Sequence, residues 1–157
     1  MKFRMVDRIL RYEPRRFIRG LKTVSFEEYS LRRDLLGPPG LPETLLLESL
    51  LQLGNWLIVL SSDFQRMGLL IRIERVEFIE PVRPGRRVLA EAVVRHYRDD
   101  GMLFDGQAFV DGRAVARGGG CLAVPAPLED YSDAEDLRVL FSQIHRPGEA
   151  HADAETA

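Results

Sequence analysis

The most apolar stretch of this sequence, residues 44 to 60, carries polar side chains at a regular spacing. These side chains are four, four and three residues apart, which places them along one face of a helix: Thr44, Glu48, Gln52 and Asn55. Moving a carboxylate out of water is costly unless it is hydrogen-bonded, paired or protonated. A protonated carboxyl group in apolar surroundings is what a general acid needs, so Glu48 is a candidate proton donor.

Two structural interpretations of Glu48 compete with that role. The carboxylate can face solvent on an amphipathic helix, or it can be held by a structural arginine such as Arg72 or Arg75. A single carboxylate on a helix is common, and its position in the pattern does not separate these alternatives from catalysis.

The segment from Leu45 to Leu60 is predicted to form a helix of the protein core. Pro42 suits the opening position of a helix, and the charge of Glu43 suits the positive end of its dipole. Within the segment only Gly54 weakens the helix. The polar stripe would be costly in hydrocarbon, so we expect no membrane span.

The segments around this helix predict an antiparallel sheet. Residues 3–12 and 16–25 are expected to be two short strands, and residues 69–79 a strand with a bulge near Glu74 and Arg75. Residues 88–97, 103–110 and 114–124 form a predicted meander, whose second turn is the hairpin signal Asp111-Gly112. The glycine triplet at 118–120 lacks the context of a phosphate loop and predicts close backbone packing or a bulge.

The composition changes at Pro125, which suggests where the main domain ends. We expect a domain over residues 1–125, a linker and an amphipathic helix over 126–146, and a disordered tail over 147–157. Ser132 and Glu135 have the spacing of a capping box for that helix. The apolar side chains that would share its buried face are Leu137, Leu140, Phe141 and Ile144.

Composition limits the classes of function. A hydrophobic content of 45% in 157 residues suits one soluble domain, and a net charge of -2 gives no support for nucleic-acid binding. With Cys121 as the single cysteine and no signal-like start, we expect a cytoplasmic protein. The first forty residues could attract an acidic partner because they are rich in arginine: Arg4, Arg8, Arg11, Arg15, Arg16, Arg19, Arg32 and Arg33.

Four segments together resemble one known family: MVDRIL, GPPGLPETLLLESLLQ, IERVEFIEPVRPGRRV and AFVDGRAVARG. From about residue 3 to residue 124, their order and spacing resemble the bacterial 3-hydroxyacyl-acyl-carrier-protein dehydratases. The resemblance implies an α+β hot-dog fold, in which a curved antiparallel sheet wraps one long helix. The second segment matches the family's helix entry at Gly37, Pro39, Pro42, Glu48 and Gln52.

The resemblance implies a role for each matching residue. In that family a histidine takes the C2 proton of the substrate, a helix carboxylic acid protonates the departing hydroxyl, and a glycine N–H polarises the thioester carbonyl. Glu48 matches the carboxylic acid, Gly37 the glycine and Gln52 a supporting hydrogen-bond partner. Trp56 and Phe78 are candidate walls of an acyl tunnel.

The family's histidine is replaced in this sequence. Its Gly-His-Phe-Pro-Gly motif falls on RDLLG, so that Asp34 stands at the histidine position and Leu36 at the proline position. His96 lies on a predicted surface strand, and His145 and His151 lie near the C-terminus. An ordinary aspartate, with a pKa of about 4, is a weaker base than imidazole.

Three functions remain open from the sequence. The protein is a dehydratase or hydratase that uses Asp34 with Glu48, a catalytically degenerate subunit that pairs with an active paralogue, or a hot-dog thioesterase in which Glu48 activates water. The resemblance favours the first two. It implies no cofactor or metal besides the pantetheine that the substrate carries, an acyl carrier protein or coenzyme A as partner, and a homodimer or larger assembly that joins the two carboxylates.

Overall fold

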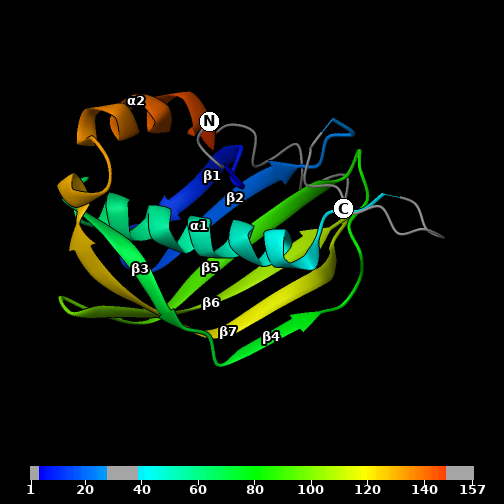
Figure 1. The fold of residues 1–157 in the computed structure, drawn as a ribbon, viewed down its shortest axis with the longest axis horizontal. Helices are drawn as coiled ribbons and strands as arrows, with labels where there is room; N and C mark the ends of the chain where they lie inside the picture. Colours follow the sequence, from blue (N-terminus) through cyan, green and yellow to red (C-terminus); the bar gives the residue numbers. More distant parts are fainter. Residues whose placement is uncertain (1–3, 28–38, 148–157) are drawn as a thin grey trace.

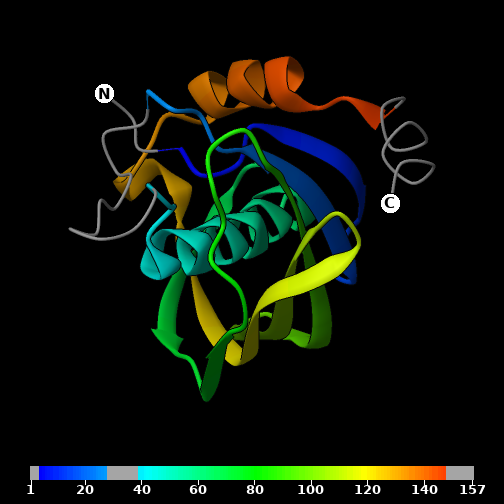
Figure 2. The same cartoon turned by 90° about the vertical axis from the view of Figure 1, so that its right-hand side faces the viewer.

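The computed structural model describes residues 4–27 and 39–147, and it places one long helix in the hollow of a curved sheet (Figures 1 and 2). The sheet is antiparallel, with the strand order β1-β2-β5-β6-β7-β3, and β4 also pairs with β7. Its strands are β1 (Arg8–Glu13), β2 (Phe17–Thr23), β3 (Arg66–Arg72), β4 (Arg75–Phe78), β5 (Arg87–Arg98), β6 (Gly101–Val110) and β7 (Arg113–Pro127). This arrangement confirms the α+β hot-dog fold, including the predicted meander of β5, β6 and β7.

The central helix, α1 (Glu43–Ser61), begins directly after Pro42, with Glu43 in its first turn as the sequence predicts. Its apolar side chains pack against the inner face of the sheet and are therefore buried all along the helix. They are Leu46, Leu50, Leu53, Leu57 and Ile58. By length and composition alone, α1 could cross a membrane. Its position within the sheet instead identifies it as the core helix.

Close approach of α1 to the sheet depends on small residues. A Cβ atom added at Gly54 would lie 2.5 Å from Cζ of Phe104, and one added at Gly106 would lie 3.0 Å from Cβ of Leu50. In the predicted glycine triplet, Gly118 pairs with Gly106 after a register shift, and Gly120 has a φ of +62°. The triplet therefore contains a bulge, one of the two alternatives that the sequence predicts.

We expect Gly54→Ala to destabilise the protein by about 1–3 kcal/mol, because overpacking a filled core forces side chains or backbone to shift. Urea unfolding measures this change as a lower midpoint with an unchanged slope. Gly101→Ala is a matched control, since the nearest atom to its added Cβ would be 3.6 Å away. Equal stabilities of the two variants would contradict the proposed packing limit.

Two predictions for the C-terminal part were wrong. The linker expected after Pro125 is instead the end of β7 followed by a 3-10 turn, η1 (Leu128–Asp130), with Leu128 buried. The cap of helix α2 (Ala134–Ile144) is Asp133 rather than Ser132. The Oδ1 atom of Asp133 accepts hydrogen bonds from the backbone N–H groups of Glu135 at 2.8 Å and Asp136 at 3.0 Å.

Helix α2 covers the C-terminal end of α1 and the outer edge of β1 (Figure 2). Phe141 lies at the centre of an aromatic cluster, with its ring centroid within 4.8–6.1 Å of the rings of Tyr12, Trp56, Phe64 and His145. After α2, the chain runs along β1, where the N–H of Arg146 donates to the carbonyl of Ile9 at 2.9 Å. The β1 edge is thus covered.

Candidate active site

The side chain of Gln52 connects Glu48 to the N-terminal segment. Its Oε1 accepts a hydrogen bond from the backbone N–H of Met5 at 2.8 Å, and its Nε2 donates to Oε1 of Glu48 at 2.9 Å. Because a backbone N–H can only donate, the carbonyl end of the carboxamide must face Met5, and the NH₂ end must face the carboxylate. Gln52 therefore fixes the position of one oxygen of the half-buried Glu48.

The other two residues of the stripe have different surroundings. Asn55 accepts a hydrogen bond from the N–H of Gly68 at 2.7 Å, which ties α1 to β3. Thr44 is exposed at the start of the helix. The predicted stripe thus contains one hydrogen-bonded pair, Glu48 and Gln52, together with a residue that ties α1 to β3 and a surface residue.

The interpretation that Arg72 or Arg75 holds Glu48 does not describe its environment. Arg72 pairs with Glu74 at 2.9 Å, and Arg75 lies exposed on β4. Among the described residues, the hydrogen-bond partner of Glu48 is Gln52, so neither Arg72 nor Arg75 holds the carboxylate. A half-buried carboxylate held by an amide on an otherwise apolar helix is positioned as a proton donor or acceptor.

The other half of the predicted site, Asp34 and Gly37, lies outside the described residues. The described chain resumes at Pro39, and the N–H of Leu41 donates to the carbonyl of Val82 at 2.8 Å. This hydrogen bond joins the entry to α1 to residues 81–85, the PVRPG part of the third segment that carries the family resemblance. Two segments that carry the family resemblance are therefore neighbours in space.

The two candidate tunnel walls have different positions. Trp56 is half-buried and faces Phe141 of α2, with ring centroids 6.1 Å apart. Phe78 is 43% exposed on β4, at the edge of the sheet. Within one chain, Trp56 thus packs in the interior, whereas Phe78 belongs to an open surface.

His96, His145 and Cys121, which lie within the described residues, do not take part in the Glu48 hydrogen bonds. His96 is exposed on β5, as predicted, and the ring of His145 stacks on Phe141 at 4.8 Å. Burial, followed by the nearby charge of Asp105, raises the pKa of the Cys121 thiol to about 11. The thiol is therefore protonated near neutral pH and unsuited to nucleophilic chemistry.

Sequence reasoning found Gln52 but missed its anchor at Met5, because a backbone N–H leaves no signal in the residue types. It also missed a cavity of about 430 Å³ between the segment that follows β4 and the hairpin that joins β6 to β7. The signal for the hairpin, Asp111-Gly112, was recognised as a turn only. The side chains around this turn carry charges of both signs.

Comparison with protein families gives a match between residues 1–118 and the model described as the FabA-like domain. Among curated relatives, a 3-hydroxyacyl-[acyl-carrier-protein] dehydratase FabZ from Aliarcobacter butzleri is 32% identical over 118 residues, covering 71% of this chain and 80% of that protein. A FabZ from Sorangium cellulosum is 35% identical over 117 residues, covering 73% and 76%.

Solved structures share the fold at much lower identity. A Streptococcus mutans protein bound to acetyl CoA matches with a TM-score of 0.61 and 12% identity, over 76% of this chain and 88% of that chain. A thioesterase from Haemophilus influenzae matches with a TM-score of 0.59 and 12% identity, over 79% and 81%. These likenesses support the architecture and carry no information about the reaction.

Proposed function

Because the chain belongs to the FabA-like domain family, we propose that it acts on 3-hydroxyacyl and trans-2-enoyl thioesters in the cytoplasm, as a homodimer, removing or adding water. The observation that carries this proposal is the arrangement of Glu48. Gln52, anchored at Met5, holds the carboxyl group in a half-buried position on the core helix. Preorganised acids of this kind supply general acid catalysis.

In the proposed reaction, Asp34 takes the proton from C2 of the 3-hydroxyacyl thioester. Glu48, in its protonated form, gives its proton to the hydroxyl on C3, which leaves as water while the C2–C3 double bond forms. The N–H of Gly37 stabilises the negative charge that develops on the thioester oxygen. The proton then returns from Asp34 to Glu48 through solvent, which restores the starting state.

The assay that tests this proposal follows a trans-2-enoyl thioester by loss of its conjugated absorbance and, in parallel, by release of free thiol. Loss of absorbance without thiol release supports a hydratase or dehydratase. Thiol release that depends on Glu48 would instead support the thioesterase alternative. A protein that is silent in both assays until a histidine-bearing paralogue is added would support the degenerate-subunit alternative.

The homodimer is supported by the open edge of the sheet. Within residues 4–27 and 39–147, the β3 and β4 strands pair on one side only, with β7. Free strand edges readily pair with another chain, particularly where apolar side chains accompany them. The exposed apolar residues here are Leu70, Ile71, Val76, Phe78 and Ile79, whereas the opposite edge at β1 is covered.

We expect Ile71→Glu to weaken the dimer about a hundredfold, because an unpaired carboxylate buried in an interface costs about 3 kcal/mol or more. Ile71 is 61% exposed in the single chain. Sedimentation equilibrium measures the change, and Val93→Glu, at a 50% exposed position on β5, is the matched control. An unmodified protein that sediments as a monomer would remove the dimer from the proposal.

The partner we propose is an acyl carrier protein, the carrier that the names of the FabZ relatives print. Arg16 and Arg19 are paired with Glu13 and Glu91, so part of the predicted N-terminal basic surface is neutralised. A second basic cluster lies beyond the C-terminal end of α1. It lines a cavity of about 330 Å³ and contains Arg66, Arg98 and the N-terminal Arg15, together with one acidic residue, Asp99.

Docking at this cluster should depend on charge. We expect Arg98→Gln to weaken binding of an acidic carrier protein about threefold to tenfold at low salt. The difference in affinity between the variant and the unmodified protein should become smaller as the salt concentration rises. Surface plasmon resonance across a salt series measures both effects. Arg117→Gln is the control, because Arg117 lies on β7 and pairs with Glu77 at 3.2 Å. Equal loss in both variants would indicate attraction by overall charge only.

A further inference from the structure

The cavity near the entry to α1 has walls that are fixed by backbone hydrogen bonds. One wall is the segment from Glu80 to Arg86, which is bonded at Val82 to Leu41 and at Gly85 and Arg86 to Val24. The other wall is the β6–β7 hairpin, whose turn has positive φ angles of 49° at Asp111 and 74° at Gly112. These bonds preform the cavity, which favours binding of a small ligand.

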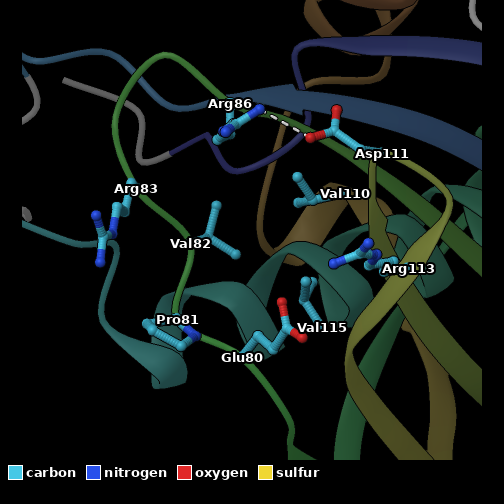
Figure 3. Close-up of a pocket in the computed structure, with 9 residues that line it drawn as sticks. All are labelled: Glu80, Pro81, Val82, Arg83, Arg86, Val110, Asp111, Arg113 and Val115. Atoms are coloured by element: carbon cyan, nitrogen blue, oxygen red, sulfur yellow. Dashed lines mark hydrogen bonds and ion pairs between the residues drawn. The ribbon is translucent and has the colours of Figure 1, made fainter. Parts of the chain in front are cut away.

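Arg86 and Asp111 join the two walls. Their side chains form an ion pair of 2.8 Å across the top of the cavity, as Figure 3 shows. This pair has no net charge and links the two walls. It leaves three charged side chains to determine what the cavity prefers: Glu80, Arg83 and Arg113.

The charges of the cavity favour one negative charge in a ligand. Arg113 reaches into the space from the hairpin, and Arg83 lies on the opposite side (Figure 3). Among the described residues, neither arginine forms an ion pair, and Glu80 is likewise without one. Two cations and one anion leave a net charge of +1, which a monoanion balances and a dianion exceeds.

The floor of the cavity is apolar. It consists of the side chains of Val82, Val110 and Val115, of which Val82 and Val115 are buried. A volume of about 430 Å³ suits a small organic molecule. Arginine binds carboxylates with paired, charge-assisted hydrogen bonds, and valines favour a short hydrocarbon body.

We propose that this cavity binds the carboxylate of a short aliphatic chain, with Arg113 as the anion-binding residue and Arg83 adding positive charge at the rim. The same chemistry has two sources: a free short carboxylic acid, or the distal carboxylate of an acyl thioester. The second source rests on the proposed function. This source requires the cavity to lie near Glu48. Leu41, which is bonded to Val82 in the cavity wall, lies seven residues before Glu48, and a helix rises only about 1.5 Å per residue, so the two are close along the chain and in space.

Titration with butyrate tests the site directly, followed by the NMR signals of the methyl groups of Val110 and Val115. We expect these signals to shift with saturation, while Val59, buried elsewhere, stays unchanged. Arg113→Gln should weaken binding about tenfold, and Arg117→Gln on the same strand should leave it unchanged. Glu80→Gln should strengthen binding about threefold, because it removes a negative charge from the cavity.

Two further ligands test which chemical groups of a ligand the cavity recognises. Methyl butyrate, which has the same body without the charge, should not shift the signals, and inorganic phosphate should bind more weakly than butyrate. Absence of saturable shifts with butyrate, or equal weakening in the Arg113 and Arg117 variants, would overturn the proposal. These measurements require no turnover, so they fail or succeed independently of the dehydratase assay.

Thioesters of equal length that end in a carboxylate or a methyl group distinguish the two sources. If Arg113→Gln lowers kcat/KM for the carboxylate-ended substrate about tenfold and spares the methyl-ended one, the cavity recognises the substrate's distal end. If both substrates respond alike while butyrate binding is lost, the ligand is a free acid.

Discussion

Glu48→Gln is expected to lower the rate of hydration of a trans-2-enoyl thioester by about 10²–10⁴-fold, the usual contribution of a general acid. The amide has nearly the shape of the carboxyl group, and an oxygen atom remains that can accept the hydrogen bond from Nε2 of Gln52. Binding of the thioester should therefore change little. The effect should appear mainly in kcat rather than in KM.

The matched control for this experiment is Glu43→Gln, which changes the same residue type in the first turn of the same helix. It should retain activity within about threefold, because loss of a helix-dipole interaction costs less than about 1 kcal/mol. Unfolding midpoints of both variants separate loss of activity from loss of structure. Full activity in Glu48→Gln would show that another group donates the proton.

Gln52→Leu removes the carboxamide that anchors Glu48 and complements this experiment. If Gln52 acts by positioning, its loss lowers kcat and leaves the pH profile of the remaining activity shaped by the same acid and base. A change in stability alone, without a change in kcat, would assign Gln52 a purely structural role.

The elements of this fold were predictable because each has a clear local signal. The apolar segment after Pro42 is too long for a strand, and Asp111-Gly112 fits a hairpin turn with two positive φ angles. The sequence predicted one strand with a bulge near Glu74 and Arg75, whereas the structure has a break there, between the end of β3 at Arg72 and the start of β4 at Arg75. The register of the β3 pairing shifts earlier, between Leu70 and Arg72.

The errors near the C-terminus have a physical cause. Prolines usually end strands because they lack an N–H donor, so the sequence at Pro125 and Pro127 indicated a linker. In the structure these residues pair with β3, and the pairing of β7 with β6, which starts at Arg113, ends at Ala123, opposite Met102. Beyond that point β7 has one neighbour, and a missing donor on its other side is tolerated.

Adjacent residues with similar chemistry caused the other error. Ser132 and Asp133 are both good helix caps, and the sequence does not distinguish them. The start of α2 is determined by docking, in which Phe141 enters the aromatic cluster and Arg138 pairs with Asp63 at 3.1 Å. Long-range contacts of this kind, like the bond between Gln52 and Met5, have no local signal.

Asp34→His is expected to raise the hydration rate by about 10²–10⁴-fold, because it introduces at position 34 the base that the sequence resemblance implies there. An imidazole with a pKa of about 6.5 accepts a carbon-bound proton more readily than an ordinary carboxylate does. The gain should require Glu48, so the double variant with Glu48→Gln should lose most of it. Gain and loss are measured with the same enoyl thioester.

Asp34→Asn is the matched control, since asparagine has the size of aspartate and no basic oxygen of comparable strength. If Asp34 is the working base, this variant loses activity that the unmodified protein has. If the unmodified protein is silent and Asp34→His alone brings activity, the chain is a subunit whose site lacks only its base. An inactive Asp34→His variant that still binds the thioester would show that position 34 does not face the substrate, which would remove Asp34 from the proposed mechanism and leave Glu48 to act with a base from elsewhere.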